Sequence, residues 1–185
     1  MKSLNLIILA LCFCACTNSS NIKKSAEIPA RAVPVFMAGM ENRTALKITL
    51  EAKGKNYNFL LLANKKENFI NFKLIGDFAA VLASVNLRGG DFEYETISPL
   101  LSDIKAKQVF EEILLALFAS GEYGDLKYKY YFNTGEIVPY KLKQKSQLLD
   151  KIFLFEDYKG TVPQKITVKT KFDIVKIDFE LLAHD

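Results

Sequence analysis

Hydrophobic and polar residues alternate along most of the chain, with a period of two that is typical of half-buried β-strands. Leu46, Ile48 and Leu50, for example, alternate with Lys47, Thr49 and Glu51. Similar short segments, separated by Gly, Asn, Asp and Lys turns, are predicted as strands at 46–53, 57–63, 70–74, 78–85, 92–95, 126–132, 137–138, 148–155, 162–168 and 175–181. Segment 78–85 also fits a short helix, but its position among hairpins favours a strand. About ten or eleven short strands at such spacing indicate a sandwich or a barrel.

One segment follows a different period. From Ser102 to Phe118 the apolar residues recur at intervals of three and four, and Ser120-Gly121 ends the pattern, which predicts a helix. The apolar surface of this helix is wider than one stripe because Leu115 and Ala116 extend it. A helix of this kind must be covered on most of its sides.

The amino-terminal segment has the properties of an export signal. Residues 6–15 form an unbroken apolar run, which is too short to span a bilayer as a helix. Ala15 and Cys16 then precede a polar stretch. Phe13-Cys14-Ala15-Cys16 resembles the lipobox of bacterial lipoproteins, in which the last Cys is acylated and becomes the first residue of the mature chain. We therefore expect a signal peptide at 1–15, a lipidated Cys16 with a flexible tether at 16–32, and a folded domain at 33–185.

Two alternatives to this interpretation remain at the amino terminus. Cys14 is a competing acylation site, and the whole segment also fits an ordinary secretory signal. Thr17, which is not acidic, follows Cys16 and favours sorting to the outer membrane by resemblance to enterobacterial lipoproteins. Two or three acyl chains would anchor the chain stably, with the domain facing the periplasm.

Composition limits the chemistry that we expect of the folded part. All three Cys lie within the first 16 residues, and the only His is His184, so Cys- or His-based catalysis and metal binding have no support. The carboxylates of Asp91, Glu93 and Glu95 share one strand and suit either acid–base chemistry or, more simply, a solvated strand face. We expect neither an enzyme nor a cofactor.

A basic and aromatic segment, Lys127-Tyr128-Lys129-Tyr130-Tyr131, suits single-stranded nucleic acid or a strand with a wet Lys face. A net charge of +4 and an exported chain favour the second interpretation, so no nucleic acid is expected as a partner.

An excess of apolar residues is the unusual feature of the chain. Segments 57–63, 78–85 and 148–155 are apolar on both strand faces, so something must cover the second face. Either the helix at 102–118 fills this space completely, or an apolar ligand occupies it. The candidate lipid-binding residues are Leu61, Val81 and Phe153 of these segments and Phe110, Leu114, Leu117 and Phe118 of the helix.

The order of these features resembles the LolA/LolB superfamily of bacterial lipoprotein carriers and receptors. The resemblance rests on the closing segments 153–158 and 162–166 and on Leu74-Ile75-Gly76-Asp77, where the family often has Pro-Leu-Gly-Gln. It implies a mainly β (α+β) fold, in which a strongly curved antiparallel sheet forms an unclosed half-barrel and helices plug its concave side. It also implies an apolar cavity for acyl chains of lipoproteins or other lipids, a non-enzymatic role in their localisation, and a periplasmic lipoprotein carrier as a partner.

The loop at Leu74–Phe78 has two interpretations. In one, Ile75 ends a strand and Phe78 begins the next buried strand. In the other, Ile75 takes the position of the receptor's protruding Leu and touches a membrane or an acyl chain. An alternative function stays open as well, namely a structural or protein-interaction lipoprotein whose interior is filled by its own helices.

Overall fold

The computed structural model describes residue 36 and residues 42–52, 54–99, 104–119, 125–133, 136–146, 149–170 and 175–184. These ranges contain ten strands, one α-helix and one 3-10 turn. In chain order they are β1 (Arg43–Ala52), β2 (Lys55–Lys65), β3 (Ile70–Ile75), η2 (Asp77–Ala79), β4 (Val81–Arg88), β5 (Asp91–Ile97), α2 (Ile104–Phe118), β6 (Asp125–Asn133), β7 (Glu136–Lys145), β8 (Lys151–Lys159), β9 (Val162–Thr170) and β10 (Val175–His184). The predicted signal peptide and tether lie outside the described residues.

All ten strands form one antiparallel sheet in the order β5-β4-β3-β2-β1-β10-β9-β8-β7-β6. Two meanders of neighbouring strands, which we call the first wing (β1–β5) and the second wing (β6–β10), are joined where β1 pairs with β10. This pairing joins distant parts of the chain, because it sets Ile48 opposite Phe179 and Leu50 opposite Ile177. β5 and β6 are the two ends of the order, so the sheet is unclosed.

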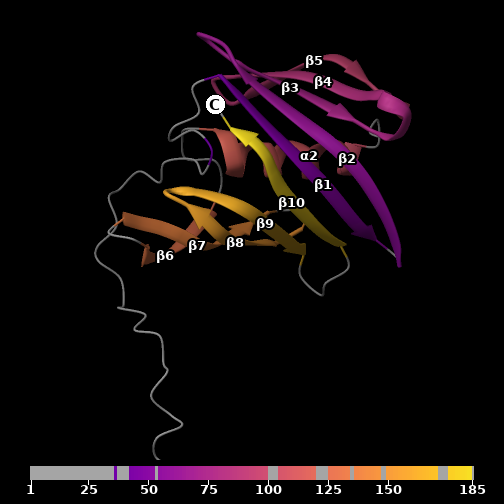
Figure 1. Ribbon diagram of the computed structural model, residues 1–185. Coiled ribbons are helices and arrows are strands. Elements are labelled where there is room, and N and C mark those ends of the chain that lie inside the picture. Colours follow the sequence, from indigo (N-terminus) through magenta and orange to yellow (C-terminus); the bar gives the residue numbers. More distant parts are fainter. Residues whose placement is uncertain are drawn as a thin grey trace, which may run out of the picture.

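The helix α2 lies in the space between the two wings, on the concave side of the sheet (Figure 1). Leu114, Leu117 and Phe118 are fully buried there, in one core cluster with residues from both wings. The ring of Phe118 stacks on Phe36 at 5.3 Å between centroids and meets the edge of Phe72 at 5.0 Å. The wide apolar surface of the helix is thus covered from both wings, as the sequence pattern predicts.

The expected architecture is confirmed in its coarse form and corrected in detail. The fold is mainly β and the sheet is antiparallel and unclosed, and the described residues contain ten strands where ten or eleven are expected. The plug, however, is a single α-helix in the ranges that the structure describes, so the α+β wording fits only in part.

Three strand predictions are wrong at their ends. The strand expected at 148–155 is β8, which begins only at Lys151 and continues to Lys159, because Tyr158 and Lys159 still pair with Pro163 and Val162 of β9. The strand expected from Phe78 begins only at Val81, because Phe78 and Ala79 both have φ values of 58°, which a strand does not accommodate. The strand expected at 137–138 continues as β7 to Lys145. Its later residues are mostly Lys and Gln, and Leu142 is fully buried among them, so the hydrophobic alternation is weak although the strand is real.

Candidate functional site

A tight turn between β3 and β4 presents Phe78 to solvent. β3 ends at Ile75, which pairs with Leu60 on one side and Val81 on the other. Two backbone hydrogen bonds close the turn, from Gly76 N–H to the Ala80 carbonyl at 2.9 Å and from Ala80 N–H to the Asp77 carbonyl at 3.3 Å. The Phe78 side chain is fully exposed at this turn. The interpretation in which Ile75 ends a strand is confirmed, but Phe78 does not begin the next one.

This turn is energetically unfavourable for the residues that form it. A left-handed φ costs an L-residue about 1–2 kcal/mol, and both Phe78 and Ala79 adopt one. Because the Phe78 ring is exposed, burial of its apolar surface does not offset this strain. Close packing limits the turn as well, since a Cβ on Gly76 would stand 3.0 Å from Leu82 Cδ1. Backbone strain of this kind clusters at functional sites in proteins.

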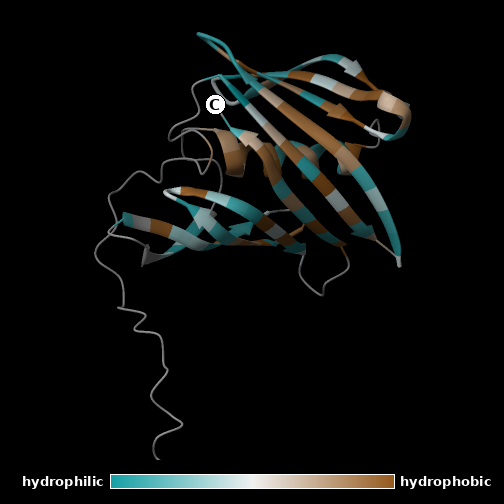
Figure 2. Ribbon diagram, viewed as in Figure 1, coloured by the Kyte–Doolittle hydropathy of each residue, from teal (hydrophilic) through white to brown (hydrophobic). Residues whose placement is uncertain are grey.

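Two more exposed apolar side chains belong to elements that reach the side of the half-barrel where this turn lies (Figure 1). Val81 begins β4, and Ile104 is the first residue of α2. Ser98, which follows β5, is held against the start of β4, because its N–H donates to the Leu82 carbonyl at 2.7 Å. Figure 2 shows the apolar colouring of the turn between β3 and β4, beside the polar ends of the neighbouring strands. We call Phe78, Val81 and Ile104 the apolar rim.

The remaining sequence-predicted lipid-binding residues lie inside the fold. Leu61, Leu114, Leu117, Phe118 and Phe153 are all fully buried in the core cluster, and Phe110 is half-buried against it. The structure therefore brings six of the nine candidates together as the filling between sheet and helix. Ile75, which is half-buried, lies next to the rim, to which Phe78 and Val81 belong.

An open groove of about 670 Å³ lies between the β4–β5 turn and α2. One wall is formed by Gly90, Asp91 and Phe92 at the β4–β5 turn, and the other by Gln108, Glu111, Glu112 and Leu115 of α2. Two apolar side chains and three carboxylates thus share its lining. This groove differs from the purely apolar pocket that an acyl chain would favour.

Next to the groove, Lys107 and Glu111 surround the half-buried ring of Tyr94. The Lys107 ammonium lies 4.4 Å above the ring centroid, and it is 3.9 Å from the Glu111 carboxylate. Burial of the phenol, with the nearby Glu111 charge as the second cause, raises the pKa of Tyr94 above its ordinary value. Tyr94 therefore stays neutral at any physiological pH.

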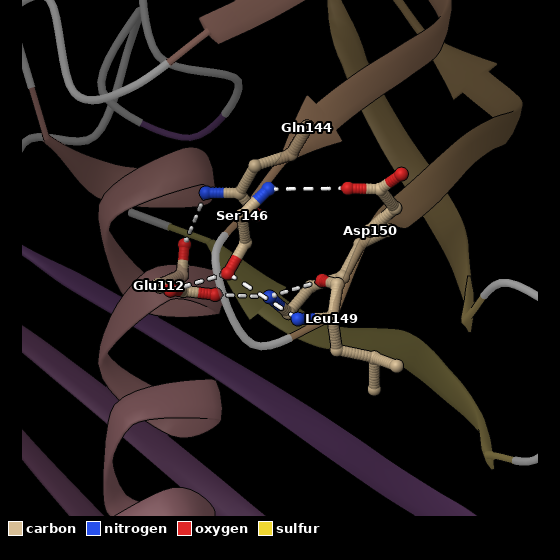
Figure 3. Close-up of polar contacts among 6 residues, drawn as sticks. Glu112, Gln144, Ser146, Leu149 and Asp150 are labelled. Atoms are coloured by element: carbon tan, nitrogen blue, oxygen red, sulfur yellow. Dashed lines mark hydrogen bonds and ion pairs between the residues drawn. The ribbon is translucent and has the colours of Figure 1, made fainter.

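A polar clamp ties the middle of α2 to the second wing, and sequence reasoning missed it. Glu112 pairs with the Lys151 ammonium and accepts a hydrogen bond of 2.8 Å from the Ser146 hydroxyl (Figure 3). Gln144 donates to the Glu112 carbonyl at 3.4 Å, and Lys151 also donates to the Leu149 carbonyl at 3.1 Å. The only signal in the sequence is Lys151, which stands directly before the apolar residues of β8. The alternating pattern of a strand gives no reason to expect this Lys side chain in the interior.

The acidic strand face predicted as solvated is indeed exposed. Asp91, Glu93 and Glu95 are exposed, while Phe92 and Tyr94 between them are half-buried. Within the described ranges no three His, Cys, Asp or Glu side chains gather as metal ligands would. In the same ranges no helix has the length and apolar character needed to cross a bilayer.

Comparisons with known proteins give little beyond this geometry. No family model and no curated protein matches the chain. Among solved structures, it is similar to a domain from Vibrio parahaemolyticus that is provisionally described as an outer membrane lipoprotein-sorting protein domain. The two share 10% sequence identity over 80% of this chain and 87% of that one, with a TM-score of 0.43. A likeness of this degree carries no argument about function.

Proposed function

We propose that this chain is a lipid-anchored protein of the outer membrane, facing the periplasm, that takes up acyl chains at a membrane surface and hands them on. The observation that carries the proposal is the apolar rim, in which a strained turn holds Phe78 fully exposed and Val81 and Ile104 are exposed as well. Exposed apolar side chains gathered at one end of a small domain are typical of contact with an apolar partner. The role is transfer, with no bond made or broken.

The burial along α2 suggests where an acyl chain would enter. The carboxy-terminal half of the helix is buried, whereas Ile104, Lys105 and Gln108 in the amino-terminal half are exposed. The clamp at Glu112 and the packing of Phe36 on Phe118 both hold the later part. An acyl chain that displaces only the first turns of α2 would therefore reach the core from the rim at the lowest cost.

The physical driving force is the removal of methylene groups from water, at about 0.8 kcal/mol for each CH₂. Release into a bilayer costs little, because both environments are apolar. The direction of transfer then follows from relative affinities. The proposed partners are the membrane, through acylated Cys16, and a periplasmic lipoprotein carrier that delivers acyl chains of lipoproteins or other lipids.

The decisive experiment removes the exposed ring. Residues 17–185 carrying Phe78→Asn should transfer a fluorescent phospholipid between liposomes several-fold more slowly than the unchanged chain. Leu182→Asn is the matched control. Leu182 is also an exposed apolar residue, but it lies on β10, which pairs with β1 and does not belong to the rim. Equal transfer by all three proteins would refute the proposal.

A second candidate function has one observation in its favour. Five of the nine predicted lipid-binding residues are fully buried in the core cluster, which supports an interior occupied by the chain's own side chains. A structural or protein-interaction lipoprotein needs only a stable domain with such an interior, and no room for a lipid. Mass spectrometry of the chain purified without detergent separates the two proposals, because bound lipid is expected only for the first.

A further inference from the structure

The two edge strands of the sheet carry opposite charges on their outer faces. At one end of the sheet, Asp91, Glu93 and Glu95 of β5 are exposed. At the other end, Lys127 and Lys129 of β6 are exposed. Edge strands present backbone N–H and C=O groups that another strand can pair with, so these two surfaces are candidates for association.

The basic edge concentrates like charges. Lys127 lies opposite Lys143 of β7, and Lys129 lies opposite Lys141. Carboxylates on a further strand would place opposite charge beside these Lys residues, and opposite-charge pairs across neighbouring strands are stabilising. The acidic edge carries negative charge instead. Asn86 and Ser84 donate hydrogen bonds to Glu95, which lower the pKa of its carboxyl group and keep it ionised.

The inner faces of the same strands are aromatic. Phe92 and Tyr94 of β5 are half-buried, as are Tyr128 and Tyr130 of β6, whose rings stack at 5.8 Å between centroids. Phe92 lines the open groove beside α2, so its inner side remains accessible to a further ring. Aromatic pairs across neighbouring strands are among the stabilising ones.

Strand direction makes the two edges compatible. All nine neighbouring pairs in the ten-stranded order are antiparallel, so β5 and β6 run in opposite directions. A second copy placed with its β6 beside β5 therefore continues the antiparallel sheet with the same face inward. The register that sets Glu93 opposite Lys129 also sets Phe92 opposite Tyr130 and Tyr94 opposite Tyr128.

We infer that copies of this chain associate head to tail, by pairing the acidic edge strand β5 of one copy with the basic edge strand β6 of the next. The inference is independent of lipid transfer. The contact is short, because a bulge in the β4–β5 ladder places an extra residue at Glu95 and ends the regular edge at Tyr94. A contact between two different surfaces leaves one free edge of each kind, so it produces chains or a ring rather than a closed two-fold dimer.

Cysteine cross-linking in cells tests the geometry on the full-length chain. Its native Cys residues all precede residue 17, so new Cys residues in the domain are distinguishable by comparison with the unchanged protein. A chain carrying both Glu93→Cys and Lys129→Cys should give a ladder of dimers and larger species on oxidation. Each single variant should give none. A faster-migrating monomer without a ladder would mean that β5 pairs with β6 of its own chain, and would overturn the inference.

Charge reversal tests the chemistry. Full-length protein in detergent micelles is followed by sedimentation velocity, with Glu93→Lys/Glu95→Lys as one variant and Lys127→Glu/Lys129→Glu as the other. Each variant alone should associate about tenfold more weakly than the unchanged chain, and a mixture of the two should recover association because unlike edges meet again. Glu51→Lys/Glu67→Lys, with the same net charge as the first variant, should leave association unchanged. Association that both reversals leave intact, or that mixing does not recover, would refute the proposed pairing.

Discussion

At the scale of single residues, the most informative one is Phe78, where conformation and exposure oppose stability. A side chain that is fully exposed at a φ of 58° contributes strain and no burial. The resemblance to a family with a protruding apolar residue predicts such a feature in this loop, but places it at Ile75. The structure moves the exposed residue by three positions, because the β-strand that Ile75 ends holds its backbone.

Replacing Phe78 should therefore stabilise the fold. Asn tolerates left-handed backbone well, so Phe78→Asn should raise the free energy of unfolding by about 1 kcal/mol. Urea denaturation measures the change in the free energy of unfolding. Leu182→Asn serves as the comparison, because it also replaces an exposed apolar side chain by Asn but relieves no backbone strain. A clear loss of stability in Phe78→Asn would show that the ring is packed against the domain in solution.

The clamp at Glu112 gives an asymmetric prediction. The Lys151 side chain is 0% exposed, while that of Glu112 is 28% exposed. Glu112→Gln leaves a buried ammonium without its counter-charge and should cost about 3 kcal/mol of stability. Lys151→Met leaves a carboxylate that still reaches water, and an apolar side chain replaces the buried one, so it should cost about 1 kcal/mol. Both values follow from denaturant unfolding.

Glu111→Gln is the matched control for this pair. Glu111 neighbours Glu112 on the same helix, but its ion pair with Lys107 is at 3.9 Å and partly exposed. Surface pairs of this kind contribute less than about 1 kcal/mol. Equal losses in Glu111→Gln and Glu112→Gln would mean that the clamp contributes no more than a surface ion pair.

At the scale of elements, β6 makes stability depend on pH at the alkaline end. Burial, with Tyr130 as the second cause, raises the pKa of Tyr128 to about 12 from an ordinary value of 10.0. The folded state then retains a proton that the unfolded state loses, so this contribution is complete below pH 10 and is lost as the pH rises towards 12. Tyr128→Phe should therefore reduce the fall in the free energy of unfolding across this pH window by about 2 kcal/mol.

Comparison with Tyr128→Phe is necessary because it separates the contribution of this phenol from every other effect of alkaline pH. Unfolding is measured at intervals of pH, and the ultraviolet absorbance of tyrosinate follows the phenol directly, which is simpler in a chain without Trp. If the free energy of unfolding depends on pH in the same way in the unchanged chain and in Tyr128→Phe, the Tyr128 phenol is solvated in the folded state.

Strand prediction succeeded where alternation reflects burial on one face only. β1 and β10 follow this rule, and the helix ends at Phe118 as its periodicity predicts. β7 was largely missed because its solvated face is Lys-rich and Leu142 is one of few buried anchors. The start of β4 was placed too early because apolar character does not reveal a left-handed φ at Phe78 and Ala79.

At the scale of the whole molecule, strand patterns alone leave sandwich and barrel open. The deciding contact is the β1–β10 pairing, which joins segments more than a hundred residues apart, and no local pattern encodes it. The resemblance to the LolA/LolB superfamily supplied the unclosed sheet and the plugging helix. It did not reveal how the candidate site divides into buried filling, such as Leu114 and Phe153, and an exposed rim.

The last prediction concerns the anchor, which lies outside the described residues. Cys16→Ala should abolish acylation, because the apolar run ends in Ala15-Cys16, and should leave the protein uncleaved or soluble. Cell fractionation and metabolic labelling with a palmitate analogue measure both effects. Cys14→Ala is the matched control and should fractionate with the outer membrane as before. If the Cys16→Ala protein remains a mature, acylated membrane species while Cys14→Ala does not, Cys14 is the anchor and the boundary of the signal peptide moves with it. If neither substitution changes acylation or fractionation, neither Cys16 nor Cys14 is required by itself, and the assignment of the anchor to Cys16 is wrong.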